Sequence, residues 1–90
     1  GFALIEAMMA GLPILSTASG SIPDVVADAG VLVPPYDTSA LAAGMERLLD
    51  PDERTFFGNA GRTRALEHFD AAKQARLLAR ALHPGVLLND

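Results

Sequence analysis

The sequence contains no cysteine, and only five of its 90 residues are aromatic. Without cysteine, disulfide frameworks, thiol nucleophiles and cysteine-bound zinc are excluded, and a reducing compartment is consistent with the composition. No apolar run approaches the ~20 residues that a membrane span requires. We therefore expect a cytoplasmic protein, and leave open whether it contacts a membrane surface. Half of the residues are hydrophobic, which is enough for the core of one small domain.

Basic residues are absent from the first half of the chain. Residues 1–46 contain five acidic side chains and no Lys or Arg, and all seven basic residues follow, interleaved with further acids. This mixture is typical of a solvated helix surface and not of a nucleic-acid stripe. The few aromatic residues are too scattered to stack bases. We expect no nucleic-acid binding.

The first half of the sequence predicts a helix, a strand, a crossover and a second strand. Residues 2–10 are strong helix formers and apolar almost all round, so we expect a mostly buried helix that ends at Gly11. The short apolar runs 13–17 and 31–33 predict strands, with one turn of helix after Pro23 between them. This order is typical of a parallel α/β sheet. Two strands are too few for such a sheet. Because the chain also begins without a start Met or a capping residue, we expect it to be a piece of a longer protein.

Three helices are predicted in the second half. Asp37 is placed to cap a helix over 38–49, and Asp50 to cap the next helix, with Glu53 completing a capping box. Asp70 would cap a third helix over 71–82. The predicted apolar face of the first of these helices consists of Leu41, Met45, Leu48 and Leu49, and that of the third of Ala71, Ala75, Leu78 and Leu82. The second helix is predicted to bury Phe56, Phe57, Ala60 and Leu66, with Gly58 and Gly61 allowing close approach of a neighbour. Phe69, which follows it, is also expected in the core.

Glu6 is the one charged residue of the apolar first helix. It could simply point to solvent, where the helix dipole favours an acid near the amino end. A carboxylate on a mostly buried helix is, however, costly unless it is paired or open to a cleft. Helix amino ends at the carboxyl edge of a parallel sheet bind anions through free N–H groups. A carboxylate one and a half turns further along can accept two hydrogen bonds from a ribose diol. We therefore hypothesise a phosphate at the amides and a ribose at Glu6.

The stretch "GFALIEAMMAGLPILSTASGSIPDVVADAGVLVPP" resembles the donor-binding segment of retaining GT-B glycosyltransferases of family 4. The resemblance continues through "YDTSALAAGMERLLDP" and "GNAGRTRALEHFD", so it covers nearly the whole chain. The order and spacing of these pieces are more specific than any one of them. The resemblance implies that residues 1–90 are part of a Rossmann-like C-terminal GT-B domain whose upstream part is missing. It also implies transfer of a sugar from a UDP-, GDP- or ADP-sugar to an acceptor.

The resemblance assigns four substrate-binding residues. Glu6 matches the second Glu of the family's E-x7-E motif, whose carboxylate binds the ribose hydroxyls of the donor. Gly1, Phe2 and Ala3 match the loop and first helical turn, where backbone amides approach the diphosphate or the sugar. The first Glu of the motif falls upstream of Gly1, and the family's Arg/Lys pair has no match in residues 1–46. We therefore assign no catalytic residue, no metal and no cofactor here, and expect the missing N-terminal domain as a partner.

This sequence departs from the family pattern in the turn before the second strand. Ser21 stands where the family has a second Gly, and Asp24 where it has Glu. We expect a structural role for this turn, with Gly20 in a tight bend and Pro23 starting a short helix. Two alternatives to the transferase stay open: a non-catalytic nucleotide-binding or degenerate α/β module, and a scaffold built on the three helices.

Overall fold

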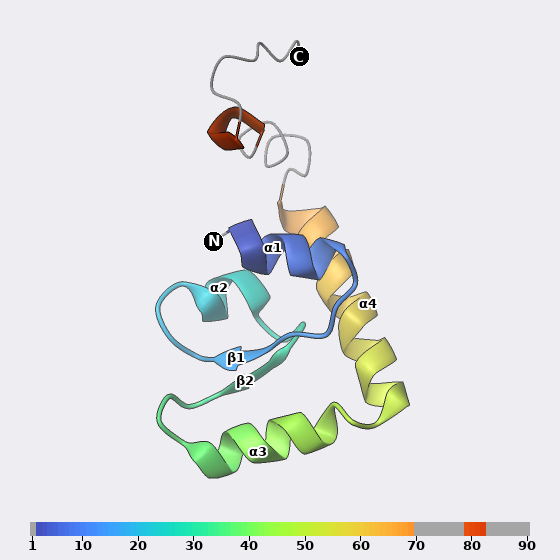
Figure 1. Cartoon of the computed structure of the whole chain (residues 1–90). Helices are drawn as coiled ribbons and strands as arrows, with labels where there is room; N and C mark the ends of the chain where they lie inside the picture. Colours follow the sequence, from blue (N-terminus) through green and yellow to red (C-terminus); the bar gives the residue numbers. More distant parts are fainter. Residues whose placement is uncertain (1, 70–78, 83–90) are drawn as a thin grey trace.

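The computed structural model describes residues 2–69 and 79–82. Phe2 is described as part of its helix, and its side chain is outside the described part. Figure 1 shows the elements in order along the chain. They are α1 (Phe2–Met9), β1 (Leu15–Thr17), α2 (Ile22–Val26), β2 (Val31–Val33), α3 (Thr38–Arg47) and α4 (Pro51–His68). The predicted cap Asp70 and most of the predicted helix 71–82 lie outside the described residues.

The two strands are parallel neighbours, as predicted. Leu15 pairs with Val31 and Thr17 with Val33. The ladder extends beyond the strands, because the Ala18 N–H donates to the Val33 carbonyl at 2.8 Å. The crossover through α2 returns the chain to the starting edge of the sheet, so both strands run in the same direction (Figure 1). The predicted α/β fold class with two short parallel strands is confirmed.

Two clusters of buried side chains form the core. The first joins α1, the residue before β1, α2 and α4 through Met8, Ile14, Val26 and Ala65. The second joins β2 to α4 through Val31, Val33 and Phe57. Gly58 brings two backbones close together beside these clusters. A Cβ on Gly58 would lie 2.4 Å from the Gly11 carbonyl oxygen, so α4 contacts the end of α1 directly through its backbone.

Helix α1 ends in a Schellman motif at the predicted glycine. The Leu12 N–H donates to the Ala7 carbonyl and the Gly11 N–H to the Met8 carbonyl, at 3.1 and 3.0 Å. Gly11 adopts φ +79°, a conformation that glycine tolerates best. The expectation of a mostly buried helix holds for only part of its surface. Ile5 and Met8 are buried, whereas an exposed stripe runs along the helix at Ala3, Glu6 and Ala10.

The predicted apolar face of α3 is wrong in orientation. Gly44 is buried, and a Cβ there would meet the Leu15 side chain at 2.7 Å. Helix α3 therefore packs on the sheet through its glycine, which permits the closest approach. The larger side chains of the predicted face flank this contact: Leu48 is half-buried, and Leu41, Met45 and Leu49 are exposed.

Helix α4 also packs through small residues. Its buried residues are Phe57, Gly58, Gly61 and Ala65. The prediction that the two glycines allow close approach is confirmed for Gly58 only, because a Cβ on Gly61 would meet its neighbours at ordinary distances of 3.6 Å or more. Phe56 and Leu66, predicted to be buried, are 60% and 55% exposed. Phe56 contacts Phe57 in a T-shaped arrangement, with 5.1 Å between the ring centroids. Phe69 is half-buried against the first cluster.

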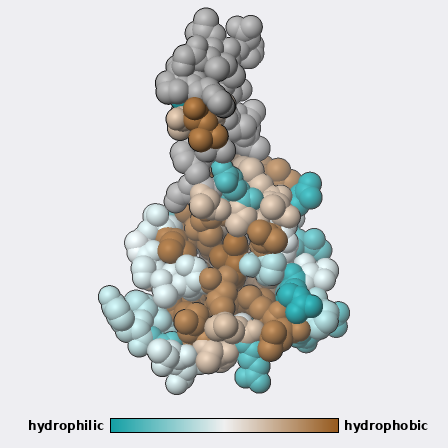
Figure 2. All heavy atoms as spheres, in the orientation of Figure 1, coloured by the Kyte–Doolittle hydropathy of each residue, from teal (hydrophilic) through white to brown (hydrophobic). Residues whose placement is uncertain are grey.

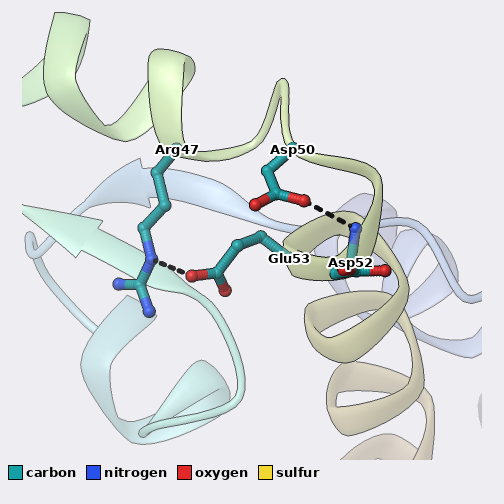
Figure 3. A network of polar contacts seen from close by, with 4 residues as sticks. All are labelled: Arg47, Asp50, Asp52 and Glu53. Atoms are coloured by element: carbon teal, nitrogen blue, oxygen red, sulfur yellow. Dashed lines mark hydrogen bonds and ion pairs between the residues drawn. The ribbon is translucent and has the colours of Figure 1, made fainter.

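The predicted helix caps are present, but the predicted capping box is not. The Asp37 carboxylate accepts from the Ala40 N–H at 2.9 Å, and the Asp50 carboxylate from the Asp52 N–H at 2.8 Å. The Glu53 carboxylate instead pairs with Arg47 Nε at 3.2 Å (Figure 3). Its expected partner is engaged elsewhere, because the Asp50 N–H donates to the Arg47 carbonyl. No helix in the described part of the chain is long and apolar enough to cross a membrane.

Candidate functional site

The candidate site lies at the carboxyl edge of the sheet. Both strands end at this edge, and the amino ends of α1, α2 and α3 gather there (Figure 1). In α1 the N–H groups of the first turn have no carbonyl partner within the helix. Such an edge presents hydrogen-bond donors and the positive ends of helix dipoles. This chemistry suits an anionic group such as a phosphate.

The predicted site residues Ala3 and Glu6 share one face of α1. They are three residues apart, so their Cβ atoms are about 5–6 Å from each other on a helix, and both are exposed. Within residues 2–69 and 79–82, no donor bonds to the Glu6 carboxylate. Among the described residues, the Glu6 oxygens therefore have no hydrogen-bond partner, and the side chain lies on the same face of the helix as Ala3 in the first turn. Gly1 lies outside the described residues, and Phe2 opens the helix.

A hydroxyl-bearing turn follows β1 at the same edge. The Ser19 N–H donates to the Thr17 carbonyl at 2.9 Å, and the two side-chain hydroxyls are 3.3 Å apart. Gly20 supports the bend with φ +56°, as its predicted role in a tight turn requires. The hydroxyls of Thr17 and Ser19 were not among the predicted site residues. The hydroxyl-rich run "STASGS" at the carboxyl end of a predicted strand was the signal that could have indicated them.

A second turn at this edge connects β2 to α3. Tyr36 is fully exposed there and adopts φ +60°, which is unusual for a bulky residue. A small pocket of about 80 Å³ lies beside it, lined in part by Thr17, Val33 and Asp37. The carboxyl ends of both strands therefore contribute polar groups to one surface.

Two arginines bind around the connection between α3 and α4, on the side away from the carboxyl edge (Figure 1). Arg54 of α4 donates to the carbonyls of Leu48 and Leu49 at 3.2 and 2.8 Å, just after α3 ends. Arg47 lies over the Phe57 ring at 4.8 Å while it pairs with Glu53. These cations bind helix ends and neighbouring side chains, away from the carboxyl edge. In the described part of the chain, no three His, Asp or Glu residues come together as a metal site would require.

A parallel α/β sheet with helix amino ends gathered at its carboxyl edge is typical of the α/β domains that bind ligands at this edge. The match to known families is more specific. The sequence pattern of the family "Glycosyl transferases group 1" matches residues 1–64. The chain belongs to this family.

Individual relatives agree with this membership. The chain is 44% identical over 75 residues to the MMP alpha-(1->4)-mannosyltransferase of Mycolicibacterium hassiacum, a match that covers 77% of this chain and 18% of the relative. It is 36% identical over 52 residues to O-antigen chain mannosyltransferase B of Escherichia coli, covering 58% and 14%. The solved structure of sucrose-phosphate synthase from Thermosynechococcus elongatus superposes with a TM-score of 0.74 at 33% identity, covering 93% of this chain and 22% of that one. The chain therefore spans about a fifth or less of the length of these relatives.

Proposed function

We propose that residues 1–90 form the C-terminal part of the donor domain of a retaining GT-B glycosyltransferase of family 4. In this proposal the protein transfers a hexose from a UDP-, GDP- or ADP-sugar to an acceptor hydroxyl. The acceptor oxygen replaces the diphosphate oxygen at the anomeric carbon with net retention, and the acceptor proton leaves with the nucleoside diphosphate. The family membership and the named transferases among the relatives support this proposal.

The observation that carries the proposal is the exposed face of α1 at the carboxyl edge. The amides of Gly1, Phe2 and Ala3 would approach the diphosphate or sugar, and the Glu6 carboxylate would accept from the ribose hydroxyls. The spacing suits a diphosphate at the amides and a ribose at the carboxylate, because Glu6 lies one turn beyond the open amides on the same exposed face as Ala3. Preorganised amides of this kind also stabilise the charge that develops on the leaving diphosphate.

An upstream part of the same protein would complete this site. Residues 1–46 have no cation to bind a diphosphate, so the proposal requires a basic pair from elsewhere. The structure offers a surface for such a part. An apolar groove of about 500 Å³ lies between Leu15 of β1, the exposed Met45 of α3 and the exposed Leu49 just after α3. Figure 2 likewise shows apolar atoms uncovered in a band across the strands. We propose that further strands and the N-terminal domain precede Gly1 and cover part of this surface.

The test is donor binding by the full-length enzyme that carries these residues. Calorimetric titration with UDP, GDP and ADP identifies the base, and the same titration of Glu6→Gln tests the site. Hydrogen bonds to a charged group are worth about 1.5–3 kcal/mol each, so the loss of the negative charge should weaken binding by about 10- to 100-fold. Glu67→Gln is the matched control, because Glu67 is an exposed acid on α4.

Each outcome has a distinct meaning. Unchanged affinity in Glu6→Gln would overturn the ribose assignment. Nucleotide binding by the wild type without any sugar transfer would favour the non-catalytic module, with which the absence of cations before Arg47 is compatible. Absence of nucleotide binding would overturn the proposal as a whole.

A further inference from the structure

Arg64 makes the longest-range side-chain hydrogen bonds among the described residues. From α4 its Nε donates to the Val25 carbonyl at 2.6 Å, and a terminal nitrogen donates to the Asp24 carbonyl at 2.7 Å. All other side-chain hydrogen bonds in this part of the chain join residues at most six positions apart. The guanidinium fork therefore binds two carbonyls near the carboxyl end of α2, with the geometry and sign that favour a cation there.

Helix α2 depends on such an external contact. It has only five residues, and Ser21 at its amino end makes no side-chain capping bond. Directly after it, Ala27 adopts φ +50° and ψ −124°, a conformation that is unfavourable for a residue with a Cβ. Strained residues of this kind persist only where the surrounding structure holds them. The Arg64 bonds hold Asp24 and Val25, which lie three and two residues before the strained Ala27.

The other end of α2 is the hydroxyl-bearing turn of the candidate site. Ser19 and Gly20 lead directly into α2, and the Ile22 N–H donates back to the Ser19 carbonyl at 3.1 Å. Ile22 of α2 and Leu4 of α1 pack against the same core cluster. The position of this short helix therefore sets the position of the turn relative to the amino end of α1.

We propose that Arg64 is a positioning residue for the donor site. By clamping the carboxyl end of α2, it holds the hydroxyls of Thr17 and Ser19 beside the first turn of α1, where they hydrogen-bond the diphosphate–sugar part of the donor. This inference rests on the proposed function. Arg64 itself lies on α4 and binds backbone carbonyls, so its effect on the donor passes entirely through α2.

The test compares Arg64→Ala with Arg62→Ala in the full-length enzyme. Arg62 is the matched control, because it is an exposed arginine on the same helix with no hydrogen bond or ion pair to the described residues. Arg64→Ala should raise the KM for the nucleotide-sugar about 10-fold and leave kcat within about 2-fold, since the turn binds the donor in both the ground and transition states. Arg64→Lys keeps the charge without the fork and should fall between the two.

Hydrogen exchange supplies a second readout in the same proteins. The amide of Ala27, bonded to the Pro23 carbonyl, and that of Val25, bonded to Ser21, should exchange about 10-fold faster in Arg64→Ala. Faster exchange with an unchanged KM would overturn the proposal, because Arg64 would then be structural only. An equal rise of KM in Arg62→Ala would overturn it too, because charge alone would explain the effect. If Arg64→Ala does not fold, Arg64→Lys supplies the same comparison. Absence of transfer by the wild type would overturn the proposed function itself.

Discussion

The contact between Gly58 and Gly11 predicts opposite effects of the same substitution at two positions of α4. A Cβ on Gly58 would lie 2.4 Å from the Gly11 carbonyl oxygen, and both partners are backbone, so the two helices must separate. A Cβ on Gly61 would find its nearest atom, the Ala29 carbonyl oxygen, at an ordinary 3.6 Å. Each Gly→Ala change gains about 1 kcal/mol of helix propensity. In Gly58→Ala this gain is opposed by an overpacking cost of about 3 kcal/mol, the upper end of the usual range. Gly61→Ala has no such cost.

Gly58→Ala should therefore lower the free energy of unfolding by about 2 kcal/mol, and Gly61→Ala should raise it by up to about 1 kcal/mol. For a chain of this size these changes correspond to a fall in Tm of about 10 °C and a rise of about 5 °C. Urea unfolding followed by circular dichroism measures both free energies under identical conditions. Stabilisation by Gly58→Ala would refute the close backbone contact. Equal destabilisation by the two variants would show that α4 packs uniformly tightly and that the difference between the glycines is not real.

Three further predictions concern the stability contributions of two turns with positive φ and of the cap of α4, and each is measured by the same urea titration. Tyr36→Gly should stabilise the chain by about 0.5–1 kcal/mol, because glycine adopts φ +60° without strain and the fully exposed Tyr36 side chain loses no packing. Tyr36→Ala should not stabilise it, and equal effects of the two substitutions would contradict backbone strain at this position. Gly11→Ala should destabilise by about 1–2 kcal/mol through φ +79° alone, since space around its Cβ is open; a neutral result would argue against the Schellman motif. Asp50→Ala should lower the free energy of unfolding by about 1 kcal/mol through loss of the cap, whereas Glu53→Ala should lower it by less than about 0.5 kcal/mol because its ion pair is exposed. Similar losses in the two variants would indicate that Glu53 takes part in a capping box.

The local features of this fold were predictable because each depends on a few adjacent residues. Gly11 ends α1 since only the chemistry of a helix end is involved, and Asp37 and Asp50 cap their helices for the same reason. The parallel pairing of β1 and β2 followed from two apolar runs and a crossover of suitable length. These arguments need no knowledge of what packs on what.

The orientation of α3 was not predictable from hydrophobic periodicity. That pattern assumes that the largest apolar side chains face the core, whereas α3 meets the sheet through Gly44. A glycine contact has no hydrophobic signal, so the exposed Met45 and Leu49 were assigned to the wrong side. Glu53 illustrates a similar limit. Its position allows either a capping box or an ion pair, and the choice depends on where the end of α3 places Arg47.

The candidate site was predictable in part. The carboxylate in an apolar helix indicated Glu6 as a candidate, and the structure places it with Ala3 on one exposed face, while its binding role stays a prediction. The bonds from Arg64 to Asp24 and Val25 span about forty residues of sequence, and no local pattern indicates them.

The backbone contact at Gly11 has a consequence for the distant end of α1. The helix has eight residues and is therefore about 12 Å long, and its carboxyl end rests on α4 at Gly58. If that contact opened and α1 tilted by about 5°, its amino end would move by about 1 Å. A displacement of this size can reduce the rate of an enzyme by about 100-fold. In the proposed donor site, Gly11 and Gly58 would then control the alignment of Ala3 and Glu6 with the donor, although neither glycine contacts it.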